Sequence, residues 1–209
     1  MHYTSVLFDL DGTLLDTLGD LTAAMNRTLT RHGLPERTRQ QMRTALGNGA
    51  RRLMELSVPS GTDSALFETL LAEYNADYAA HCRIETAPYP GLLDTQGRKL
   101  AIVSNKPDEA VRALRADFFA DAVQIAVGET AAIRRKPAPD MLLAAMEQLG
   151  ADPDKTVFVG DSEVDIATAR AADLPCISVL WGFRDRDVLE RAGAQQYAAD
   201  IAQLQALLG

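Results

Sequence analysis

Short runs of consecutive apolar residues recur along the chain, and stretches with a different periodicity separate them. The apolar runs are typical of strands that are buried on both faces of a sheet, and they lie at 5–10, 99–104, 122–127, 156–160 and 176–181. Between them, apolar residues are spaced three and four apart, as in helices that pack on one side, at 108–119, 139–150 and 163–174. This alternation predicts an α/β fold with a doubly wound, Rossmann-like parallel sheet.

The stretch after the first predicted strand breaks the alternation. Three segments there have helical periodicity with no predicted strand between them: 21–33, 49–56 and 64–82. Two prolines and a glycine at 87–91 then favour a stiff, extended return to the sheet. We therefore predict an all-helical cap domain at 17–84, inserted into a core domain formed by 1–16 and 85–209.

Composition restricts the possible partners. The chain has 209 residues, of which 47% are hydrophobic, enough for a sizeable core. A net charge of -8 argues against nucleic acid or an anionic membrane as partner. Cys82 and Cys176 show no disulfide or zinc spacing, and we find no signal peptide or membrane-spanning run. We expect a cytoplasmic monomer or homodimer that acts on a small molecule.

Polar residues follow the predicted strands, where the carboxyl ends of parallel strands form one binding edge. Three of the strands contribute a pair of such residues, and one lysine precedes a helix: Asp9 and Asp11, Ser104 and Asn105, Asp161 and Asp165, and Lys136. Carboxylates, a hydroxyl, an amide and an ammonium are therefore expected to converge at that edge.

This set of groups suits phosphoryl transfer. A carboxylate is ionised at neutral pH and attacks phosphorus without a general base, which makes Asp9 the candidate nucleophile. A phosphate dianion would be repelled by it, so the site needs Mg²⁺, with Asp9 and Asp161 among its oxygen ligands. Asp11 is placed to protonate the leaving oxygen. Ser104 and loop amides would bind the phosphoryl oxygens, and Lys136 would neutralise their charge.

Most of these residues also have a purely structural interpretation. Asp9 and Asp11 next to a glycine fit a turn, 162–165 fits a helix capping box, and Lys136 fits a surface lysine. Ser104 and Asn105 also fit polar residues that mark the start of the following helix. Asp161 precedes the capping box, so capping does not explain it.

Four motifs carry a resemblance to a known family: DLDGTLLDT (9–17), VSNKP (103–107), RRKPAPD (134–140) and VGDSEVDIATA (159–169). In this order they resemble the motifs of the haloacid dehalogenase superfamily of phosphatases. The resemblance implies that Ser104 and Lys136 bind the phosphoryl group, that the Asp11 carbonyl is a metal ligand, and that Asp165 orients metal-bound water. It also implies that the helical insert closes over the site and selects the substrate.

Within the superfamily the chain is most similar to the phosphoglycolate phosphatases, through GNGARRL (47–53), YPG (89–91), VSNKP and WGFR (181–184). We therefore expect hydrolysis of a small phosphate monoester, 2-phosphoglycolate, through an aspartyl phosphate. Arg51 or Arg52 would receive the substrate carboxylate at a helix start, unless both arginines lie in solvent. The predicted substrate-binding residues are Ser104, Asn105, Lys136, Arg51 and Thr13. The predicted metal-binding residues are Asp9, Asp11, Asp161 and Asp165.

One segment departs from the family pattern. Between Gly91 and Lys99 the chain is shorter than is usual, so we expect a reduced helix there and a less covered sheet face. Two alternative functions remain: a phosphomutase of the same superfamily that acts on a sugar phosphate, and a noncatalytic regulatory protein built on this fold.

Overall fold

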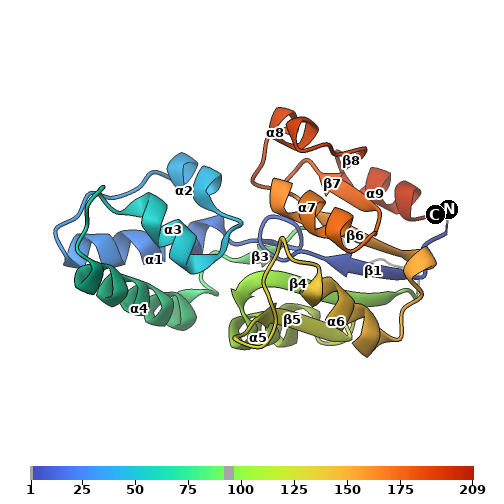
Figure 1. Ribbon diagram of the computed structural model, residues 1–209, viewed down its shortest axis with the longest axis horizontal. Coiled ribbons are helices and arrows are strands. Elements are labelled where there is room, and N and C mark those ends of the chain that lie inside the picture. The colour runs from blue at the N-terminus through green and yellow to red at the C-terminus, as the bar shows by residue number, and fades with distance from the viewer. Residues whose placement is uncertain (1, 92–96) are drawn as a thin grey trace. The chain divides into compact units, whose positions relative to one another are not determined.

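The computed structural model describes residues 2–91 and 97–209. The chain divides into two compact units, which we call the core unit and the helical unit (Figure 1). The core unit comprises the chain up to Leu15 together with Pro88–Gly209, and the helical unit comprises Asp16–Ala87. The predicted short helix between Gly91 and Lys99 falls largely on residues 92–96, which lie outside the described residues.

The core unit contains a six-stranded sheet in the order β5-β4-β1-β6-β7-β8. Its strands are β1 (Ser5–Phe8), β4 (Lys99–Pro107), β5 (Ile125–Glu129), β6 (Thr156–Gly160), β7 (Cys176–Val179) and β8 (Gln196–Ala198). All pairings along this order are parallel. Numbered by their order along the chain, these strands run 3-2-1-4-5-6, which is the doubly wound order. The predicted fold class is therefore confirmed, and β1 and β6 flank the point where the strand order reverses.

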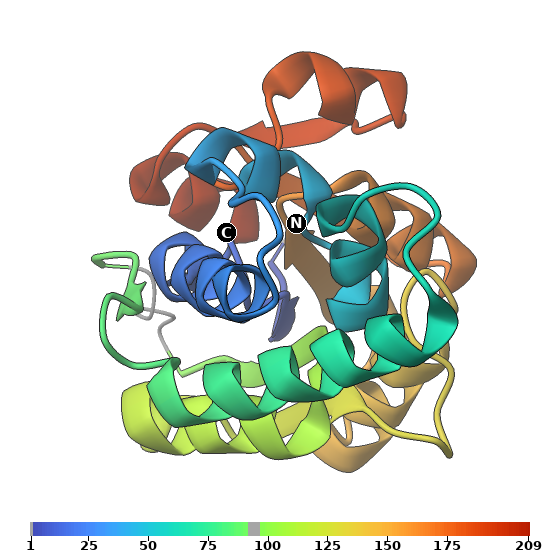
Figure 2. The same cartoon turned by 90° about the vertical axis from the view of Figure 1, so that its left-hand side faces the viewer.

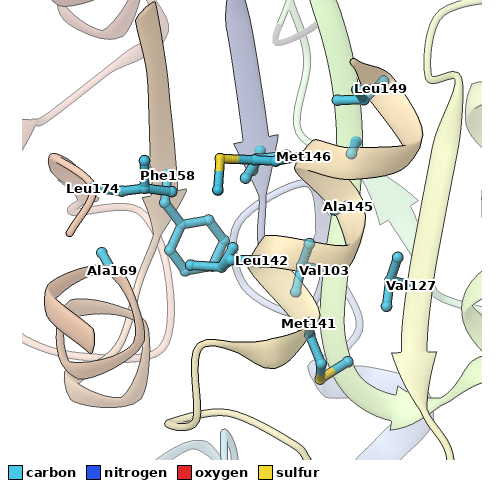
Figure 3. Close-up of a cluster of buried hydrophobic side chains, with 12 residues drawn as sticks. Val103, Val127, Met141, Leu142, Ala145, Met146, Leu149, Phe158, Ala169 and Leu174 are labelled. Atoms are coloured by element: carbon cyan, nitrogen blue, oxygen red, sulfur yellow. The ribbon is translucent and has the colours of Figure 1, made fainter. Parts of the chain in front are cut away.

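Helices cover the sheet on both faces (Figure 1). They are α5 (Asp108–Phe119), α6 (Asp140–Leu149), α7 (Glu163–Ala171), α8 (Arg186–Arg191) and α9 (Ile201–Leu208), with a 3-10 turn, η1 (Pro153–Lys155), before β6. Leu7 of β1 pairs with Ala101 of β4 and Phe158 of β6. These three residues belong to one buried cluster in which Leu142 of α6 lies against the Phe158 ring (Figure 3).

The opposite face of the sheet is buried as well. Val6 and Phe8, the neighbours of Leu7 in β1, are fully buried, and so are Val157 and Val159 of β6. Successive side chains of a strand point to opposite faces, so both faces of the central strands are covered. This double burial is why the strands appear in the sequence as uninterrupted apolar runs rather than as an alternating pattern.

Some boundaries differ from the predicted ones for local reasons. The strand expected at 122–127 begins at Ile125, because the amides of Ala122 and Val123 bond to the Phe119 carbonyl and extend the turn after α5. The helix expected to reach 174 ends at Ala171, and Asp173 adopts a positive φ of 55°. The elements α8, β8 and α9 were not predicted; they are short and carry little periodic signal.

The helical unit consists of α1 (Leu18–Arg31), α2 (Arg39–Ala45), α3 (Gly49–Ser57) and α4 (Ser64–His81). Helices α1 and α4 pack along each other (Figure 2). The sequence predicted α1, α3 and α4 but missed α2, whose start is fixed by a capping box between Thr38 and Gln41. The buried Asp77 of α4 accepts hydrogen bonds from Arg27 and Arg31 of α1.

Two short strands, β2 (Leu15–Asp16) and β3 (Ala87–Pro88), pair where the chain leaves and returns to the core unit. Next to this point, the buried Asp20 accepts backbone N–H groups from Ile84, Glu85 and Thr86. Among the described residues, no helix is both long and apolar enough to cross a membrane.

Candidate active site

Four of the predicted residues meet at the carboxyl ends of β1 and β6. Asp9 follows β1 and Asp161 follows β6, Asp165 lies in the first turn of α7, and Lys136 lies between β5 and α6. Carboxylate oxygens of Asp9, Asp161 and Asp165 lie within 4.8 Å of one another. The Lys136 Nζ is 2.6 Å from Asp9 Oδ1 and 2.7 Å from Asp165 Oδ1. Ligands bind at such a switch point in doubly wound sheets.

Burial controls the electrostatics of this cluster, because all four side chains are withdrawn from solvent. Burial raises the pKa of Asp9 well above its usual value; Lys136 opposes this shift, and the neighbouring carboxylates add to it. Burial and the charge of Asp165 raise the pKa of Asp161 to about 7. For Lys136, burial disfavours the charged form, but Asp165 and Asp9 outweigh it and raise its pKa.

The charge balance of the cluster fits a divalent cation. Ionisation of all three carboxylates around one ammonium would leave an excess of two negative charges in a buried place. The donors are all carboxylate oxygens, which suit Mg²⁺ or Ca²⁺ better than a thiophilic metal. Burial is the largest cause of the raised pKa values of Asp9 and Asp161, and the neighbouring carboxylates add to it. A cation bound beside them would favour their charged forms.

Asp165 has both oxygens engaged within the protein. Its Oδ1 accepts from Lys136, while its Oδ2 accepts from the Ser162 hydroxyl at 2.6 Å and the Ser162 N–H at 3.0 Å. The capping-box interpretation of 162–165 is therefore correct, and the same aspartate also contacts Lys136 in the buried cluster. A side chain at Gly160 would place a Cβ 2.4 Å from the Asp165 Cβ, so glycine is required for this close approach.

Asp11 is paired with a lysine that the sequence analysis did not single out. The Lys106 Nζ lies 3.2 Å from Asp11 Oδ1, and the two side chains are 6% and 20% exposed. Ser104, two residues before Lys106, is buried, and its Oγ accepts the Lys106 N–H at 3.3 Å. The signal was available in the sequence, since Lys106 lies within the VSNKP motif beside Ser104 and Asn105.

Asn105 is placed differently from the expectation. Its Oδ1 accepts the Lys136 N–H at 2.8 Å, and its Nδ2 donates to the Lys136 carbonyl at 3.0 Å. The amide thus holds the backbone of Lys136, and its contact with substrate stays a prediction. Thr13 is fully buried, and its hydroxyl donates to Asp161 Oδ1 at 3.5 Å, so it too contacts a candidate metal ligand.

The segment 181–184 positions Asp161. The Phe183 N–H donates to Asp161 Oδ2 at 2.6 Å, and the Trp181 indole donates to the Thr13 carbonyl at 3.1 Å. A Cβ at Gly182 would lie 2.3 Å from the Asp161 Cβ and 2.6 Å from the Gly12 carbonyl oxygen. The WGFR motif was predicted only to mark the resemblance to phosphoglycolate phosphatases, and its contact with Asp161 was not predicted.

Arg51 lies in the helical unit, in the first turn of α3. Its two terminal nitrogens donate to the Glu68 carboxylate at 2.9 and 2.8 Å, and its side chain is half-exposed. Arg52 is paired with Glu55. Both arginines therefore occupy the solvent-facing ion pairs of the alternative interpretation, and a contact of Arg51 with substrate stays a prediction.

The fold is a doubly wound α/β core with a helical insert after its first strand. The sequence pattern of haloacid dehalogenase-like hydrolases matches residues 6–179. This match covers most of the chain, and the relatives below agree with it. The chain belongs to the haloacid dehalogenase-like hydrolases, which confirms the family inferred from the motifs.

Named relatives are phosphatases. A phosphoglycolate phosphatase of Pseudomonas putida is 34% identical over 97% of this chain and 78% of its own length. An N-acetylmuramic acid 6-phosphate phosphatase of Pseudomonas aeruginosa is 33% identical over 88% of this chain and 84% of its own. A crystal structure from Lactobacillus delbrueckii, provisionally described as a phosphoglycolate phosphatase, superposes with a TM-score of 0.94 at 35% identity and covers 100% of this chain and 99% of its own.

Proposed function

We propose that the chain is a Mg²⁺-dependent phosphatase that hydrolyses a small phosphate monoester, 2-phosphoglycolate, through an aspartyl phosphate on Asp9. One observation carries the proposal: a buried aspartate directly follows β1 at the switch point, 2.6 Å from a buried lysine and beside two further buried carboxylates. The phosphoglycolate phosphatases among the relatives support the choice of substrate.

In the first half of the reaction, an Asp9 oxygen forms a bond to phosphorus while the bond from phosphorus to the bridging oxygen breaks. Asp11 gives its proton to the departing alcohol. In the second half, a water oxygen forms a bond to the phosphorus of the aspartyl phosphate while the bond from phosphorus to the Asp9 oxygen breaks, and a proton of the water passes to Asp11. Phosphate is released and both aspartates return to their initial states.

The other side chains of the cluster bind and orient. Lys136 holds Asp9 Oδ1 and supplies positive charge where the phosphoryl oxygens accumulate negative charge. The Ser104 hydroxyl is the candidate donor to a phosphoryl oxygen. Asn105 fixes the backbone of Lys136 through its two hydrogen bonds, so that the ammonium stays between its two carboxylates.

The residues that would hold the metal are Asp9, Asp161 and the carbonyl of Asp11, with Asp165 in support. When bound, Mg²⁺ polarises the phosphoryl oxygens and offsets the charge of the nucleophile. Asp161 is held for this role by the Phe183 N–H. Such supporting contacts commonly change metal affinity by about 10- to 100-fold.

The test is phosphate release by the purified protein, with Mg²⁺ and with chelator, from 2-phosphoglycolate and a panel of small phosphates. Asp9→Asn should abolish turnover with the fold intact, because an amide is a far weaker nucleophile than a carboxylate. Asp187→Asn, an exposed carboxylate on α8, is the matched control and should behave as wild type.

Substantial turnover by Asp9→Asn would refute the nucleophile assignment. Undiminished activity in the presence of chelator would refute the proposed dependence on Mg²⁺. A higher kcat/KM for another ester would replace 2-phosphoglycolate as the substrate and leave the chemistry in place.

A further inference from the structure

Lys106 is a buried cation that the proposed chemistry does not use. Its side chain is 6% exposed, whereas Lys155 of the same unit is 59% exposed, as is usual for lysine. Its Nζ lies 3.2 Å from Asp11 Oδ1. Keeping an ammonium out of water is costly, and the contact with Asp11 offsets part of that cost.

The two buried lysines serve different carboxylates. Lys136 contacts Asp9 and Asp165, on the side of the nucleophile. Lys106 contacts Asp11, the residue assigned to protonate the leaving oxygen. The positive charge of Lys106 therefore lies beside the place of the departing alcohol, and the phosphoryl oxygens already have Lys136 and Ser104.

We propose that Lys106 binds a carboxylate carried by the departing alcohol, and so selects esters with an anion next to the bridging oxygen. This inference rests on the proposed phosphatase activity and names the side chain that recognises the carboxylate of the substrate. In 2-phosphoglycolate one methylene separates the bridging oxygen from the carboxylate. An ammonium in contact with the acid that protonates the bridging oxygen is therefore within reach of that carboxylate.

The arrangement of Arg51 supports this assignment. Both terminal nitrogens of Arg51, the residue first predicted to receive the carboxylate, are bonded to Glu68. Its side chain is half-exposed, so solvent and salt weaken any further attraction it exerts. Lys106 acts from a nearly dry position on β4, where a charge-assisted hydrogen bond is stronger.

The experiment compares kcat/KM for 2-phosphoglycolate with that for 2-hydroxyethyl phosphate, in which a neutral hydroxymethyl group replaces the carboxylate. In Lys106→Met the ratio of the two should fall by about tenfold to hundredfold, the value of one charge-assisted hydrogen bond. Lys106→Arg keeps the charge and should retain more of the ratio. Lys155→Met, the exposed lysine, is the matched control and should keep the wild-type ratio.

Three results would overturn the assignment. Equal losses on both esters would mean that Lys106 only positions Asp11. If the ratio of kcat/KM values fell in Arg51→Ala but not in Lys106→Met, Arg51 and not Lys106 would be the residue that binds the substrate carboxylate. Wild-type protein that cleaves both esters equally well would remove the selectivity, although its phosphatase activity would stand.

Failure of the proposed phosphatase function can be distinguished from failure of the Lys106 assignment alone, because wild-type protein would then cleave neither ester. That result would refute the assignment of Lys106 as well. If Lys106→Met does not fold, product inhibition of the wild type decides. Glycolate should inhibit and ethanediol at the same concentration should not, and equal inhibition by both would overturn the proposal.

Discussion

Lys136→Met isolates the electrostatic role of Lys136 in stability. Methionine preserves most of the side-chain length and volume, so the change removes the charge without opening a large cavity. It leaves Asp9 and Asp165 buried without the ammonium that lies 2.6 and 2.7 Å from them. It also removes a cation 5.5 Å from the centre of the Phe158 ring.

The expected loss of stability in Lys136→Met follows from the burial of the Lys136 ion pairs. Removing one partner of a buried ion pair costs about 3–5 kcal/mol, a large part of the roughly 5–15 kcal/mol that stabilises a domain. For a chain of this size, each kcal/mol shifts Tm by about 2–4 °C, so Tm should fall by about 6–20 °C. The pKa of Lys136 is raised in the folded protein, so the contribution is complete at pH 7 and is lost only as the pH rises through the folded-state pKa.

The assay is thermal unfolding at pH 7 in the presence of chelator, so that added metal does not replace the missing charge. Lys155→Met, on the surface, should change stability by less than about 0.5 kcal/mol. The double variant Lys136→Met/Asp165→Asn should lose less stability than the sum of the single variants, since it removes both charges of one pair. A fall in Tm below about 3 °C for Lys136→Met, or strict additivity in the cycle, would refute the reasoning.

Two further substitutions test other parts of the molecule. Asp77→Ala should lower the free energy of unfolding at pH 7 by about 1–3 kcal/mol. Burial alone would raise the pKa of Asp77, but hydrogen bonds from Arg27 hold this pKa below its usual value. The difference in stability from wild type should therefore vanish as the pH falls through the folded-state pKa. Urea unfolding at pH 7 and in acid measures this, and an equal difference at both would contradict it. Gly182→Ala should raise the Mg²⁺ concentration needed for half-maximal turnover about 10- to 100-fold, because the added Cβ would displace Asp161. Magnesium titration of activity measures it, and an unchanged titration would contradict the positioning role.

Local patterns were enough to predict the class of fold. Strand β6 and helix α5 have the predicted bounds, because an apolar run between turns and a helical spacing of apolar residues are both local signals. Elements with weak periodicity were missed: α2 and α8 are short and expose most of their residues. Their positions depend on caps and on packing against neighbours, which a single segment does not record.

The sequence by itself determined which residue types stand at the ends of the parallel strands, because a residue that follows a buried strand must lie at the edge of the sheet. Asp9 and Asp161 could be identified in this way, and Lys136 by its place before a predicted helix. Only the tertiary structure decided which charges pair: Lys136 with Asp9 and Asp165, and Lys106 with Asp11. These pairs join segments far apart in the chain, and their energies depend on distance and burial, which exist only after the sheet has formed.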